Sequence, residues 1–247
     1  MYDLTHFTAK QMTECCAAVR ELGVGSASME EATNRVVRYF FEHLVVQPSG
    51  RRACALDRFF KTHPLASLGP ALQTYAKALL PTQPPSGTVQ CLTLLATAGE
   101  RPEWNARAQS KGHQAIPLAS EAAVAQAPMI ATLIKQFGVD VGAVVRPEPN
   151  LLLDLSQRTF NVFHVPDAQG SPYIPAQREF VIPCGIRSVL GMGGVLPSGS
   201  LFAVILFSRQ AISRGTAELF KPMALNIKMA VLPFESAVFA SSGRDGG

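Results

Sequence analysis

The sequence has little charge. Asp, Glu, Lys and Arg make up 16% of its 247 residues, whereas about 25% is usual for globular proteins. Hydrophobic residues account for 47%, and this balance excludes an intrinsically disordered chain, which needs many charges and few apolar side chains. The composition therefore predicts a globular protein with a large core and some uncharged surface buried against a partner. The length suits one elaborated domain.

Cysteines are also scarce. Five cysteines, an odd number, do not provide the paired framework of a small disulfide-stabilised scaffold. Cys15 and Cys16 are adjacent, and free thiols of this kind favour a reducing cytoplasm. Residues 1–6 lack the basic start and apolar run of a signal peptide, so we expect a cytoplasmic location.

Clusters of basic residues are nearly absent. The formal net charge is +4, yet Arg51 and Arg52 form the only adjacent basic pair. Nucleic-acid-binding proteins concentrate Lys and Arg on one face or along one helix, and we therefore expect no nucleic-acid partner.

One stretch, residues 188–208, carries no charge and is long enough to cross a bilayer. Glycines and a proline interrupt it: Gly191, Gly193, Gly194, Pro197 and Gly199. Because residues 196–200 have the composition of a turn, we interpret the stretch as two buried strands joined by a hairpin, with no membrane span.

Hydrophobic periodicity predicts the remaining elements. Helices are expected over residues 13–22, 28–47, 64–79, parts of 120–137, and 213–232. Strands are expected over residues 53–60, 89–98, 159–165, 186–196 and 201–208. Ser28 and Glu31 have the spacing of a capping box. Residues 141–145 and 151–155 are short apolar runs of uncertain type. This order predicts an α+β fold with an antiparallel sheet.

The last predicted helix carries apolar residues in alternating steps of four and three, which is typical of a coiled-coil contact. Its candidate dimer residues are Phe220, Ala224, Ile227 and Val231. We therefore expect a homodimer.

Three segments carry a resemblance to a known family: Gly-Ile-Arg-Ser-Val-Leu at 185–190, Leu-Phe-Ala-Val-Ile-Leu-Phe-Ser at 201–208, and the amphipathic segment 220–230. Together they resemble the end of a GAF domain. Segments 59–64, 91–97 and 163–167 resemble an atypical GAF-like sensor module found at the front of bacterial histidine kinases and related signalling proteins.

The resemblance implies a central antiparallel sheet of about six strands flanked by helices, with N-terminal and terminal amphipathic helices. It also implies a sensor of a small ligand or redox state that relays its signal through a dimer helix to a kinase, cyclase or phosphatase output, in the same chain or another. Residues 1–236 would form this single domain, with an N-terminal helical extension. Residues 237–247 would be a disordered tail or linker, and the chain itself would have no catalytic activity.

Two features of GAF subgroups are missing. The Asn-Lys-Phe-Asp-Glu signature of cyclic-nucleotide binders is absent, and no cysteine is followed by histidine as in bilin attachment. The cofactor, if the protein has one, is therefore unknown. The histidines have no partner at metal-ligand spacing, so we expect no metal site.

The candidate ligand residues are His164, Tyr173, Cys184, Arg187 and Ser188. His164 ends a strand before the proline-rich loop 166–183, and that loop with Tyr173 is either a lid or an ordered decoration. Cys184 lies beside Gly185 and Arg187, where a cation would favour the thiolate. Arg187 needs either an anionic ligand or an internal acid such as Asp167 or Glu179.

Two alternatives remain at this stage. Some GAF-fold proteins are enzymes that reduce free methionine sulfoxide with cysteines, for which Cys91 and Cys184 are the candidates here. The other alternative is a dimerisation module without a ligand.

Overall fold

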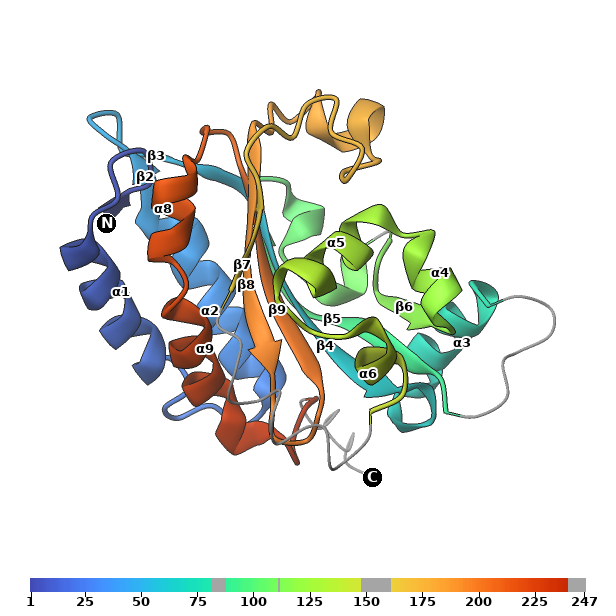
Figure 1. Ribbon diagram of the computed structural model, residues 1–247. Helices are drawn as coiled ribbons and strands as arrows, with labels where there is room; N and C mark the ends of the chain where they lie inside the picture. The colour runs from blue at the N-terminus through green and yellow to red at the C-terminus, as the bar shows by residue number, and fades with distance from the viewer. Residues whose placement is uncertain (81–87, 111, 148–160, 240–247) are drawn as a thin grey trace.

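A six-stranded antiparallel sheet lies at the centre of the computed structural model, which describes residues 1–80, 88–110, 112–147 and 161–239. The strand order is β6-β5-β4-β9-β8-β7 (Figure 1). The strands are β4 (Cys54–Pro64), β5 (Gln90–Gly99), β6 (Ala115–Leu118), β7 (Val162–Val165), β8 (Ser188–Val195) and β9 (Leu201–Ser208).

The charge-free stretch forms the hairpin that the sequence predicted. Every residue of β8 and β9 is buried, and β9 lies between β4 and β8 in the middle of the sheet. Strands buried on both faces have continuous apolar sequences, not alternating ones, which explains the likeness to a membrane span. Within the described ranges, no helix is long and apolar enough to cross a membrane.

Four helices cover one face of the sheet (Figure 1). They are α1 (Ala9–Glu21), α2 (Met29–His43), α8 (Arg214–Leu219) and α9 (Met223–Val231). Helix α1 begins earlier than predicted because Thr8 and Gln11 form a capping box at its start. At α2, the Ser28 hydroxyl accepts from the Glu31 N–H as expected, whereas the Glu31 carboxylate accepts from the Ala27 N–H.

The predicted continuous helix over 213–232 is two helices. Helix α8 ends at Leu219, and α9 begins after Pro222, whose ring is tolerated only at the first turn of a helix. The four candidate dimer residues on this segment are fully buried inside the protomer, and Phe220, Ile227 and Val231 belong to the core shared with α1, α2 and the sheet. Their spacing therefore reflects packing within one chain.

The other face carries α4 (Glu121–Ala125), α5 (Pro128–Gln136) and α6 (Val141–Val145), while α3 (Pro70–Ala78) lies at the β6 end of the sheet (Figure 1). The helix expected from residue 64 was predicted wrongly. Strand β4 continues through His63 and Pro64, which pair with Cys91 and Gln90, and α3 starts only after Gly69. The second uncertain run, 151–155, lies outside the described residues.

A small sheet and the C-terminal segment complete the layer of α1, α2, α8 and α9. Strands β1 (Tyr2–Asp3), β2 (Leu44–Val46) and β3 (Arg51–Arg52) form the small sheet. The carbonyls of Ala237 and Val238 accept from the first two amides of α2, and Phe239 packs against the core. The folded unit therefore includes residues 237–239, beyond the boundary expected at 236.

Six antiparallel strands flanked by helices on both faces make this an α+β fold, with the central sheet and flanking helices that the sequence resemblance implied.

Candidate ligand-binding site

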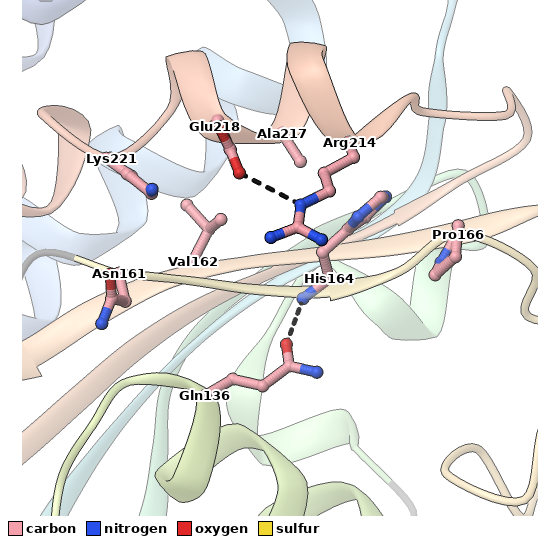
Figure 2. A pocket seen from close by; sticks show the side chains of 9 residues that line it. All are labelled: Gln136, Asn161, Val162, His164, Pro166, Arg214, Ala217, Glu218 and Lys221. Carbon is pink, nitrogen blue, oxygen red and sulfur yellow. Dashed lines mark hydrogen bonds and ion pairs between the residues drawn. The ribbon is translucent and has the colours of Figure 1, made fainter.

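A hollow of about 530 Å³ lies beside β7, the edge strand of the sheet. Figure 2 shows its lining from three elements: the end of α5, strand β7 and helix α8. The lining residues are Gln136, Asn161, Val162, His164, Pro166, Arg214, Ala217, Glu218 and Lys221.

His164 is the central side chain of this hollow. Its backbone N–H donates to the Gln136 side-chain oxygen at 2.7 Å, which satisfies one polar group of the free strand edge. The ring Nε2 lies 2.9 Å from the carbonyl oxygen of Ile212, so Nε2 carries the proton and Nδ1 is left as an acceptor. Burial and the nearby Arg214 lower the pKa of His164, which keeps the ring neutral near pH 7.

The opposite wall is charged. Arg214 and Glu218 of α8 form an ion pair at 3.1 Å (Figure 2). Lys221 is half-buried and makes no ion pair with any described residue. A ligand in the hollow would therefore meet a neutral imidazole acceptor, an amide, the Arg214–Glu218 pair and an ammonium group that no described carboxylate pairs with.

A second hollow of about 330 Å³ shares His164 and extends along residues 165–173. Tyr173 lines it with 45% of the residue exposed. The loop that follows contains one turn of π-helix, Gln177–Val181. Of the five predicted ligand residues, His164 and Tyr173 are brought together at these two hollows.

The other three predicted residues lie elsewhere. Cys184 is buried, with its Sγ 3.5 Å from Arg101 Nη2. Ser188 is fully buried, and its hydroxyl donates to the Gln210 carbonyl, which is a structural role. Arg187 is exposed and forms no ion pair with Asp167, Glu179 or any other described acid, so the expected internal salt bridge is absent from the described part of the chain.

Sequence reasoning missed Gln136, Arg214 and Lys221. Gln136 ends α5, Arg214 begins α8 and Lys221 lies in the link between α8 and α9, and no spacing or motif joins them to His164. Only the path of β7 between α5 and α8 places them around one space.

The two cysteines of the enzyme alternative do not converge. Cys91 is the second residue of β5 and pairs with His63. Cys184 contacts Arg101, which follows the opposite end of the strand. From Cys91 to the end of β5 the strand spans roughly 26 Å, so these thiols cannot act as a pair. In the described ranges no group of His, Cys, Asp and Glu could hold a metal ion.

Comparisons with known proteins find only weak structural likenesses. No protein-family model and no curated protein matches the sequence. Similar solved structures include the free methionine-R-sulfoxide reductase from Neisseria meningitidis in complex with its substrate, at 10% identity and a TM-score of 0.45, covering 90% of this chain and 91% of that chain.

The GAF domain of a phosphoenolpyruvate-protein phosphotransferase from Coxiella burnetii is similar at 11% identity and a TM-score of 0.46, covering 92% and 94% of the two chains. A bacteriophytochrome from the photosynthetic bacterium R. palustris is similar at 8% identity and a TM-score of 0.40, covering 94% of this chain and 40% of that chain. These weak likenesses carry no inference about activity or ligand.

Proposed function

We propose that the chain is a GAF-like regulatory domain that binds a small polar molecule in the hollow around His164. The observation that carries this proposal is the combination of a 530 Å³ space, an imidazole acceptor and an ammonium group at one edge of the sheet. A pocket with a few convergent polar groups is the usual form of a small-molecule site. The ligand would combine a hydrogen-bond donor for His164 with a negative group for Lys221.

The relay would run through α8 and α9. Helix α8 lines the hollow, and only residues 220–222 separate it from α9. The outer face of α9 exposes Leu225 and Met229 at 41% and 46%, and Leu232, the residue directly after the helix, is 37% exposed. Their spacing of four and three residues forms one stripe. We place the homodimer contact on this stripe, in place of the buried seam, and the ligand would bias two arrangements of the helices.

In this proposal the protein acts in cytoplasmic signal transduction, in the manner of sensors associated with histidine kinases and two-component systems. The output domain, a kinase, cyclase or phosphatase, would belong to the same chain or to another. The domain contributes binding and relay, without catalysis of its own.

Native mass spectrometry of the protein as purified from cells tests the binding step. We expect a bound small molecule in the wild type and its loss in His164→Ala and in Lys221→Met. The matched control is Lys77→Met on α3, which should retain it. Absence of any bound mass, with no change in the dimer, would instead favour a ligand-free dimerisation module, and retention in both hollow variants would place the ligand elsewhere.

A further inference from the structure

Arg58 is a further cation that forms no ion pair with a described residue, and it does not line the His164 hollow. It belongs to β4 and pairs with Thr97 and Ile205, so its side chain leaves the sheet on the face covered by α4–α6. The Nη2 atom lies 3.4 Å from the Ser110 hydroxyl, and Nε is buried without any hydrogen-bond partner. No carboxylate among the described residues forms an ion pair with Arg58.

The described groups that contact Arg58 include no carboxylate. The Ser110 hydroxyl accepts from the guanidinium and donates its own proton to the Gly112 carbonyl at 2.6 Å. The Tyr75 oxygen accepts from the His113 N–H at 2.9 Å, which leaves the phenolic O–H free to donate. His113 is exposed and has a positive φ of 63°, a conformation that costs energy in a residue with a side chain.

This arrangement is unusual for a partly buried arginine. A guanidinium taken out of water is ordinarily paired with a carboxylate or phosphate, because its desolvation is otherwise uncompensated. Burial lowers the pKa of Arg58 to about 10, opposed only by the nearby Tyr75, as expected where the protein itself supplies no anion.

We propose that Arg58, with the free O–H of Tyr75 and His113 beside it, binds the oxyanion of a small ligand, a carboxylate or a phosphate. The planar guanidinium presents two parallel N–H groups that match either oxyanion. The half-buried side chain reaches the surface beside exposed His113, which gives the ion a path of entry. This site does not depend on the His164 hollow, and either proposal can fail without the other.

Isothermal titration of the full chain with sodium phosphate, and separately with sodium succinate, tests the site against sodium chloride at equal ionic strength. We expect saturable binding of at least one oxyanion. Arg58→Met should weaken it about tenfold or more, since a charge-assisted pair is lost, and should leave the protein without added anion at least as stable as the wild type. The arm that responds identifies the ligand chemistry as phosphate or carboxylate.

Arg187→Met is the matched control, because Arg187 is exposed and unpaired among the described residues, and it should bind like the wild type. Arg58→Lys keeps the charge but loses the parallel donors, so intermediate binding is expected if Arg58→Met fails to fold. Binding of neither oxyanion above the chloride control, or equal binding by the Arg58 variants and the wild type, would overturn the proposal.

Discussion

Gly23 packs so closely against α9 that a β-carbon on it would overlap the carbonyl oxygen of Ala230. This contact joins the loop after α1 to the last long helix of the domain. It explains why α1 and α9 pack directly together, and it makes the absence of a side chain at Gly23 a requirement of the fold.

We expect Gly23→Ala to lower the free energy of unfolding by about 3 kcal/mol, because a backbone carbonyl cannot move aside as a flexible side chain can. Chemical denaturation measures this loss. Gly25→Ala is the control: Gly25 has a φ of 73° and open space around it, so only the backbone penalty of about 1 kcal/mol applies. Equal losses in the two variants would contradict the contact.

Placing the proposed dimer contact on the exposed stripe of α9 predicts how self-association responds to charge. Met229→Glu should abolish self-association, measured by size-exclusion chromatography with light scattering, while the free energy of unfolding of the protomer changes by less than about 0.5 kcal/mol. Ile227 is fully buried in the protomer, so Ile227→Ala should cost about 3 kcal/mol of stability through a cavity. A dimer that persists in Met229→Glu and Leu225→Glu would place the interface on another surface.

His63 predicts a loss of stability in acid. Both ring nitrogens are buried without a hydrogen-bond partner in the described part of the chain, and burial, followed by the charge of Lys61, lowers the pKa of His63 to about 3. Below pH 6.5 the unfolded chain binds a proton at this ring and the folded chain does not. The contribution of His63 to the free energy of unfolding therefore falls as pH drops from 6.5 toward 3, by up to about 1.4 kcal/mol per pH unit.

His63→Leu removes this dependence, which denaturation from pH 4 to 8 can measure. The stability of the variant relative to the wild type should rise steadily below pH 6.5 and stay constant between pH 7 and 8. A constant difference over the whole range would show that His63 is not the responsible group.

The buried Asp57 carboxyl predicts that folding stability changes with pH in the opposite direction. It is fully buried, and neither carboxyl oxygen has a hydrogen-bond partner among the described residues. Burial raises the pKa of Asp57 well above 3.8, so the folded chain keeps the proton after the unfolded chain has released it. Stability from this group is therefore present below pH 3.8 and is lost as pH rises toward the folded pKa.

Asp57→Asn has no proton to lose. Its stability relative to the wild type should increase as pH is raised from 4 to 8, when both proteins are compared by urea denaturation. A difference independent of pH would show that the wild-type carboxyl does not titrate in this range.

Arg107 holds the C-terminal segment against α2. It forms an ion pair with Glu30 at 3.0 Å, and its guanidinium lies 5.3 Å from the centre of the Phe239 ring. Arg107→Ala should cost about 1 kcal/mol and should speed hydrogen exchange at the amides of Met29 and Glu30, which bond to Ala237 and Val238. Lys10→Ala removes an exposed ion pair on α1 and should leave those amides unchanged.

The sheet was the most predictable part of the fold. The charge-free hairpin and strand β5 have continuous apolar sequences that only a buried strand explains, and their bounds agree closely with the prediction. The helix expected at Pro64 was wrong because proline suits a strand end as well as a first helical turn. Pairing with β5 makes residues 63 and 64 part of a strand, and the local sequence does not reveal that pairing partner.

The candidate site was predicted only in part. His164 stood out because it ends a strand before a proline-rich loop, but its neighbours depend on tertiary structure. Arg58 gave no signal. A strand sequence predicts that Asp57 and Arg58 point to opposite faces, but it does not reveal that no described residue forms an ion pair with either of them. The buried residues of α9 show a further limit, because a helical repeat identifies an apolar face without saying which chain covers it.

The strand order has a consequence for how the protein is made. Strands β6, β5 and β4 come from the first half of the chain and β9, β8 and β7 from the second, and only the pairing of β4 with β9 joins them. On the ribosome, one edge of β4 stays unpaired until β9, from the other half of the sheet, has emerged. The nascent chain thus carries an open strand edge, a surface prone to misassembly, and the two halves of the sheet are natural fragments for a split-protein reassembly experiment.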